Sequence, residues 1–162
     1  MGLLAALGLA GCGGSGGPLA LVGGDPPSGA EPYGQRAARQ GTNDTDAGKP
    51  VFRLSPSAGQ AVSFSVRVRN GGRSRVAVTG VKPDPDRDGV FAPSGVAGAP
   101  VSVAPGAEAT VTVQGAIRGC ERYGGQLVPL AGPDLRLRTP EGDSTQQVPL
   151  PYRVDVLTAG CA

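Results

Sequence analysis

Residues 62–69 hold the most regular alternation of apolar and polar side chains in the chain. Valine or phenylalanine occupies every even position from 62 to 68, and serine or arginine occupies every odd position from 63 to 69. Because successive side chains of a strand point to opposite faces, this period of two predicts a strand with one buried face. Asn70-Gly71-Gly72 then favours a tight turn, and valines at 76, 78 and 81 predict a return strand. We therefore expect a β-hairpin here.

Shorter strands are predicted along the rest of the C-terminal two-thirds of the chain. Their apolar positions are the valines at 101, 103, 111, 113, 154 and 156, with Pro105-Gly106 as a turn and Tyr152 in the closing strand. Weaker candidates are residues 127–130, 135–139 and 147–150, with a turn at 140–143, whereas residues 82–100 are expected to form a long loop. No stretch predicts an amphipathic helix. Seven or eight short strands separated by turns predict an all-β fold, a β-sandwich over residues 51–162.

This strand pattern resembles the immunoglobulin-like adhesion and accessory domains of bacterial surface proteins. The resemblance rests on the alternating strand at 62–69, on its Asn-Gly turn, and on Val-Ala-Pro-Gly-Ala-Glu-Ala-Thr-Val-Thr-Val at 103–113. It implies that the β-sandwich is immunoglobulin-like.

The first twelve residues indicate export. Leu9-Ala10-Gly11-Cys12 follows an apolar run and resembles the lipobox of bacterial lipoproteins. The resemblance implies that residues 1–11 are a signal peptide cleaved after Gly11, and that Cys12 carries diacylglycerol at the outer face of a cytoplasmic membrane. Residues 1–11 lack the basic residues of a secretory signal, which a start codon assigned too far downstream would explain. The alternative is a Gly/Ala-rich N-terminus that merely contains a cysteine.

Residues 12–50 show no sustained helical or strand period and are rich in Gly, Ser and Pro. We expect a disordered linker, and a coil of this length would reach roughly 35 Å from the lipid headgroups. Its one apolar patch, residues 19–22, is too short to fold alone.

Composition limits the chemistry that the protein can perform. The chain has no His, which removes Ser-His-Asp and Cys-His catalysis and nearly every catalytic zinc site. The formal net charge of +2 is too small to indicate nucleic-acid binding, which calls for a clearly basic face. We therefore expect a protein that is not an enzyme.

Cysteine usage agrees with export. If Cys12 is acylated, Cys120 and Cys161 remain as an even pair in a compartment that permits disulfides. We predict that they are bonded, which would pin the C-terminus and stabilise the domain by roughly 3 to 4 kcal/mol. The alternative is a catalytic thiol, for which the chain offers no His as activating base.

One segment resembles a metal-binding loop. Residues 84–89, Asp-Pro-Asp-Arg-Asp-Gly, match the first six positions of a calcium loop, in which three carboxylates converge on a hard cation. Asp84, Asp86 and Asp88 are therefore candidate ligands for weak Ca²⁺ binding. However, Gly95 stands where an EF-hand has its bidentate Glu, and Arg87 adds a positive charge. The alternative is a solvated turn.

Arginines flank the predicted hairpin and recur in a later strand. They are Arg67, Arg69, Arg73, Arg75, Arg136 and Arg138. If both strands lie in one sheet, these guanidiniums could face anionic lipid headgroups or anionic wall polymers. The alternative is an ordinary solvated face whose charges deter edge pairing.

Together these features predict a lipid-anchored, non-catalytic binding or scaffolding module on the extracytoplasmic face of a bacterial cell membrane. Its partner would be an envelope protein and not a nucleic acid, contacted through residues 82–100 or the arginine face. The alternative function is a lipoprotein that binds a small ligand or weakly binds Ca²⁺ through residues 84–88. No cofactor other than this Ca²⁺ is expected.

Overall fold

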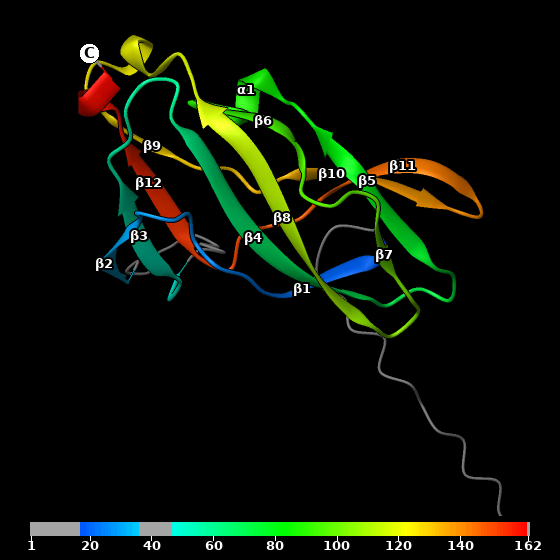
Figure 1. Ribbon diagram of the computed structural model, residues 1–162. Coiled ribbons are helices and arrows are strands. Elements are labelled where there is room, and N and C mark those ends of the chain that lie inside the picture. Colours follow the sequence, from blue (N-terminus) through cyan, green and yellow to red (C-terminus); the bar gives the residue numbers. More distant parts are fainter. Residues whose placement is uncertain (1–16, 36–46, 162) are drawn as a thin grey trace, which may run out of the picture.

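The computed structural model describes residues 17–35 and 47–161, in which twelve strands form three four-stranded sheets (Figure 1). The β4 sheet has the order β1 (Leu19–Gly23), β4 (Ala61–Asn70), β8 (Glu108–Ile117) and β6 (Phe91–Val96). The β10 sheet has the order β11 (Gly142–Gln147), β10 (Asp134–Thr139), β5 (Val76–Lys82) and β7 (Val101–Val103). The β12 sheet has the order β2 (Glu31–Gln35), β3 (Pro50–Leu54), β12 (Arg153–Leu157) and β9 (Leu127–Pro129).

Helical structure in these residues is limited to three single turns. They are α1 (Pro85–Asp88) and the 3₁₀ turns η1 (Cys120–Tyr123) and η2 (Thr158–Cys161). Within the described ranges, none of them has the length and apolar character needed to cross a bilayer.

One apolar core joins the three sheets. The valines and phenylalanine of β4 point inward, whereas Arg67 and Arg69 are exposed, so the alternation predicted at 62–69 is confirmed. Val66 of β4, Leu135 of β10 and Val154 of β12 are fully buried members of the same cluster. The predicted all-β sandwich is thus the observed fold.

The predicted hairpin between β4 and β5 is wrong. β4 pairs with β1 and β8, whereas β5 pairs with β7 and β10, so residues 71–75 cross from one sheet to another. The cause is the side chain of Asn70, which is fully buried at this corner. Its Nδ2 donates to the carbonyl oxygens of Ser74 at 2.8 Å and Val103 at 2.9 Å, and its Oδ1 accepts from the Gly72 amide. Asn70 therefore stabilises a crossover in place of a hairpin turn.

The N-terminal part of the structure also differs from the expected linker. Two strands, β1 and β2, fall in the segment that the sequence assigned to a disordered tether. β1 extends the β4 sheet as an antiparallel edge strand, with Leu19 opposite Asn70. β2 pairs in the same way with β3. The apolar patch at 19–22 is too short to fold alone, and it becomes ordered because β4 supplies its hydrogen bonds.

Hydrogen bonds from Leu19 and Asp25 to other parts of the domain hold this N-terminal segment in place. The Leu19 amide donates to Oε1 of Gln146 at 3.1 Å, and Nε2 of Gln146 donates to the Leu19 carbonyl at 2.6 Å. Asp25 and Ser65 exchange backbone hydrogen bonds of 3.2 and 3.0 Å. The buried hydroxyl of Tyr152 donates to the Asp25 carbonyl oxygen, 2.7 Å away, and lies 3.2 Å from the Ser65 carbonyl oxygen.

Two other expected elements lie elsewhere. Residues 82–100 are not one long loop, since they contain α1 and then β6, which pairs with β8. The strand expected at 147–150 is shifted toward the N-terminus, because β11 ends at Gln147 and forms a hairpin with β10 around residues 140–141.

The sandwich has two ends, separated by the ten residues of β4, or about 30 Å. At the Pro18 end, the Gly71 amide donates to the Pro18 carbonyl oxygen at 2.9 Å, and the Gly106 amide donates to the Asn70 carbonyl oxygen at 2.8 Å. At the disulfide end lie η1, η2, α1 and the loop of residues 57–60, whose Gly59 amide donates to the Ile117 carbonyl oxygen. Figure 1 shows α1 and the C-terminus together at the top of the molecule.

Candidate functional site

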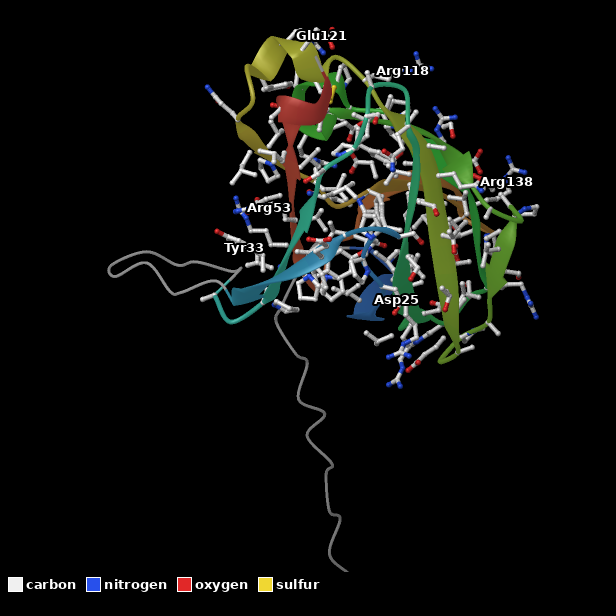
Figure 2. The ribbon with its side chains drawn as sticks, turned by 60° about the vertical axis from the view of Figure 1, so that its left-hand side comes forward. Asp25, Tyr33, Arg53, Arg118, Glu121 and Arg138 are labelled. Carbon is white, nitrogen blue, oxygen red and sulfur yellow. A yellow bond between two sulfur atoms is a disulfide. The ribbon has the colours of Figure 1, made fainter. Side chains whose placement is uncertain are left out.

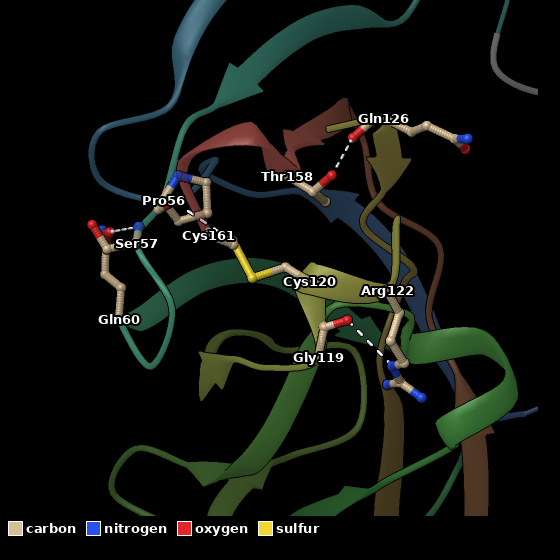
Figure 3. The surroundings of a disulfide bond; sticks show 9 residues. All are labelled: Pro56, Ser57, Gln60, Gly119, Cys120, Arg122, Gln126, Thr158 and Cys161. Atoms are coloured by element: carbon tan, nitrogen blue, oxygen red, sulfur yellow. Dashed lines mark hydrogen bonds between the residues drawn. A yellow bond between two sulfur atoms is a disulfide. The ribbon is translucent and has the colours of Figure 1, made fainter. Parts of the chain in front are cut away.

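Cys120 and Cys161 form a disulfide, as predicted, with their Cα atoms 5.9 Å apart (Figure 3). Both residues are buried, and the Sγ of Cys161 lies 3.8 Å from the Pro56 carbonyl oxygen. Nearby, the Thr158 hydroxyl donates to the Gln126 carbonyl oxygen at 2.9 Å. The bond joins η1 to η2, so it fixes the chain after β12 against the end of the domain. Cys12, the predicted lipidation site, lies outside the described residues.

The aspartates of the candidate calcium loop are engaged within the loop itself. The Asp84 carboxylate accepts from the Asp86 amide at 3.2 Å and so caps the single turn of α1. The Asp88 carboxylate accepts from the Asp84 amide at 2.7 Å. Arg87 turns toward Asp134, with which it forms an ion pair of 2.7 Å. Two of the three carboxylates therefore hold backbone amides instead of converging on one point.

The electrostatics of this loop follow from partial burial. Desolvation raises the pKa of the Asp88 carboxyl above its ordinary value, against the opposing effects of the Asp84 amide and the Arg87 charge. Across residues 17–35 and 47–161, no group of three or more His, Cys, Asp or Glu side chains is arranged to hold a metal ion. Calcium binding at Asp84, Asp86 and Asp88 stays a prediction.

The predicted arginine face is split between two sheets. Arg67 and Arg69 project from the outer face of the β4 sheet, while Arg136 and Arg138 project from the outer face of the β10 sheet. The condition that both strands lie in one sheet is therefore not met. The buried residues next to these arginines pack into the shared core from different sheets, so the two pairs lie on different outer faces of the sandwich. The four side chains therefore do not form a single cationic surface.

Several of these arginines already have carboxylate partners. Arg69 lies 2.6 Å from Glu108, which also stands 3.9 Å from Arg67. Arg138 pairs with Asp143 at 2.9 Å, and this contact lowers the pKa of the Asp143 carboxyl. All of these pairs are exposed, so each contributes little to stability.

Arg73 and Arg75 differ from the other arginines of the predicted face. Both are exposed in the crossover between β4 and β5, at the Pro18 end. Arg75 donates to the Ser102 hydroxyl at 3.2 Å. In the part of the chain that the structure describes, neither guanidinium has a carboxylate within ion-pair distance. Their positive charge is therefore available to an external anion.

A cleft of about 440 Å³ opens beside Arg73. Its walls include Pro18, Gly72, Arg73, Ser74 and Glu141. The Ser74 hydroxyl donates to Oε1 of Glu141 at 3.1 Å, and hydrogen bonds from Thr139 and Ser74 help to lower the pKa of that carboxyl. The cleft lies beside Pro18, next to the start of β1.

A second cleft, of about 570 Å³, lies between the β12 and β10 sheets. Leu21, Lys49, Leu130, Pro149 and Tyr152 line it. The sequence does not indicate this cleft, because these residues come from four separate segments.

The β12 sheet carries one exposed aromatic contact. The guanidinium of Arg53 lies 3.7 Å from the ring centroid of Tyr33, whose side chain is 61% exposed. Figure 2 shows this pair on the opposite side of the molecule from Arg138. The pair joins β2 to β3 and was not predicted, since β2 lies in the segment expected to be disordered.

No protein-family model matches the chain, and a search of curated proteins finds no match.

Proposed function

We propose that the protein is a lipid-anchored binding or scaffolding module on the extracytoplasmic face of a bacterial cell membrane. The observation that carries this proposal is the short sequence distance between Cys12 and the first residue that is hydrogen-bonded to the domain. Leu9-Ala10-Gly11-Cys12 resembles a lipobox, and Pro18, which accepts a hydrogen bond from the domain, comes six residues after Cys12. A lipid on Cys12 would hold the sandwich next to the membrane.

The chemistry of the chain supports export and a non-catalytic role. The buried Cys120–Cys161 disulfide is typical of oxidising compartments such as the bacterial periplasm. The sequence contains no His to serve as general base for a serine or cysteine nucleophile. The resemblance of residues 62–69 and 103–113 to immunoglobulin-like adhesion and accessory domains supports an interaction role.

The surface that would meet a partner is the disulfide end, because anchoring at Cys12 leaves it farthest from the anchor. This end includes the first part of residues 82–100, predicted to carry partner contacts. Asp86, Arg118 and Glu121 are exposed there, and Figure 2 shows Arg118 and Glu121 together at this end. Loops on a rigid β scaffold are common sites of recognition.

Site-specific crosslinking in cells tests the proposal. A photoreactive residue at Asp86 or Glu121 should capture one dominant envelope protein, and the same residue at Pro105, at the Pro18 end, should not. Recovery of the protein alone after efficient crosslinking would contradict a protein partner and favour a small-ligand or polymer-binding role.

A further inference from the structure

The position of Pro18 limits how far the domain can move from a lipid on Cys12. Pro18 and Leu19 are fixed by the Gly71 amide and by the side chain of Gln146. Pro18 is the sixth residue after Cys12, and a fully extended chain spans at most about 3.3–3.6 Å per residue. The Pro18 end therefore lies within about 20 Å of the anchor, whereas a tether running to residue 50 would have left the domain free to turn.

The charges at the Pro18 end match a negatively charged surface. Arg73 and Arg75 are exposed without a carboxylate partner among residues 17–35 and 47–161. Among the described residues, Glu108 forms an ion pair with Arg69 and Asp143 forms one with Arg138. Glu141 bonds to the neutral Ser74 hydroxyl and keeps its negative charge, so it offsets one of the two arginine charges. In the described part of this end, two unpaired arginines therefore stand against one carboxylate without a cationic partner, which leaves a positive balance.

We propose that the Pro18 end is the membrane-facing surface of the domain, and that Arg73 and Arg75 bind phosphate oxygens of anionic phospholipid headgroups. The inference rests on the proposed lipid anchor at Cys12. A planar guanidinium suits phosphate because it offers paired N–H donors. An anionic leaflet attracts basic residues within a Debye length of its surface, and the short link to Cys12 holds Arg73 and Arg75 within reach of it.

The first consequence is a fixed orientation, which energy transfer to the bilayer measures. The acylated protein, extracted from membranes, is labelled with a donor dye at Pro105→Cys or at Ser57→Cys. These positions are exposed turn residues at the Pro18 end and the disulfide end. Cys12 is blocked by its lipid, and Cys120 and Cys161 are bonded to each other, so one thiol reacts. The labelled protein is placed in vesicles containing phosphatidylglycerol and a headgroup acceptor dye.

Transfer from position 105 should clearly exceed transfer from position 57, since β4 separates the two ends by about 30 Å. Equal transfer, or greater transfer from position 57, would overturn the proposed orientation. Intact mass of the same sample establishes the acyl group beforehand. A missing lipid would contradict the proposed function together with this inference, whereas equal transfer in an acylated sample would overturn this inference alone.

The second consequence concerns the two arginines. Transfer from position 105 should rise when phosphatidylcholine vesicles are replaced by vesicles containing phosphatidylglycerol. Arg73→Gln with Arg75→Gln should abolish this rise. Arg118→Gln with Arg122→Gln, an equal loss of charge at the disulfide end, should leave it intact. An identical response in both double variants, or no response to phosphatidylglycerol in the unaltered protein, would overturn the headgroup contact and favour another anion, such as a wall polymer.

Discussion

The side-chain amide of Gln146 pairs with the backbone of Leu19 as a neighbouring strand would, donating to its carbonyl and accepting from its amide. Both residues are buried. Leu19 lies on the edge strand β1 of one sheet and Gln146 on the edge strand β11 of another. One side chain therefore closes the sandwich along an open side and holds the N-terminal segment in place.

Gln146→Leu should destabilise the domain by about 3 kcal/mol, because the buried amide and carbonyl of Leu19 lose their partner. Urea unfolding measures this change, and hydrogen exchange should speed up over residues 19–25. Gln147→Leu, at the exposed neighbouring position, should change stability by less than about 0.5 kcal/mol. An unaltered unfolding midpoint together with unaltered exchange in Gln146→Leu would show that the pairing does not hold β1.

Tyr152 predicts a loss of stability at alkaline pH. Burial, with a smaller effect of Asp25, raises the pKa of the Tyr152 hydroxyl well above its ordinary value of 10.0. Above pH 10 the unfolded chain loses this proton while the folded protein retains it. Stability is therefore intact below pH 10 and falls above it, by about 1.4 kcal/mol per pH unit from this group.

Tyr152→Phe provides the comparison. At pH 7 the variant should be less stable by about 1 kcal/mol, since the hydroxyl no longer donates to the Asp25 carbonyl oxygen. Near pH 11 its stability should equal that of the unaltered protein, because both share every other titrating group. Urea midpoints that stay parallel from pH 7 to pH 11 would rule out this role for Tyr152.

Removing the disulfide should cost about 4 kcal/mol in the chain-entropy description, given the sequence separation of 41 residues between Cys120 and Cys161. The variant Cys120→Ala with Cys161→Ala, compared with the unaltered protein in urea, measures this loss. Reductant should bring the unaltered protein to the same midpoint and leave the variant unchanged. A variant as stable as the oxidised protein would mean that the bond does not stabilise the fold.

Substitution of Asp86 distinguishes the two interpretations of residues 84–89, a weak calcium site and a solvated turn. Its carboxylate is exposed, whereas those of Asp84 and Asp88 accept backbone hydrogen bonds. We expect calorimetry with about 5 mM Ca²⁺, within the range of weak extracellular sites, to show no heat of binding. We also expect Asp86→Ala to leave thermal stability unchanged. Saturable heat that Asp86→Ala abolishes, but that the control Asp143→Ala retains, would establish the calcium alternative.

The sequence predicted what depends on neighbouring residues. The strand at 62–69, the turn at 140–143 and the all-β class all follow from local alternation and turn residues, and the disulfide follows from the cysteine count. Pairing between strands was not predictable in the same way. Asn70-Gly71-Gly72 favours a hairpin, but Asn70 instead hydrogen-bonds to Ser74 and Val103, and the Val103 partner is distant in sequence.

The N-terminal segment also depends on strand pairing that its local sequence does not predict. The apolar run at 19–22 is too short to predict a strand by itself, and β1 and β2, each five residues long, depend on β4 and β3 for their hydrogen bonds. Gln146 is a polar residue in a polar strand, so the sequence does not indicate that its side chain is buried and hydrogen-bonded to Leu19. The sequence alone also could not show that Arg67 and Arg136 lie on different sheets, because alternation assigns each side chain to an outer face without saying which sheet its strand joins.

Intact-mass analysis of the protein extracted from bacterial membranes tests the central claim most directly. A lipid-anchored module predicts a chain that begins at Cys12 and carries the mass of a diacylglycerol group on that residue, with or without a further acyl chain. An unmodified chain that still contains Met1 would contradict the lipid anchor and, with it, the membrane-facing orientation of the domain.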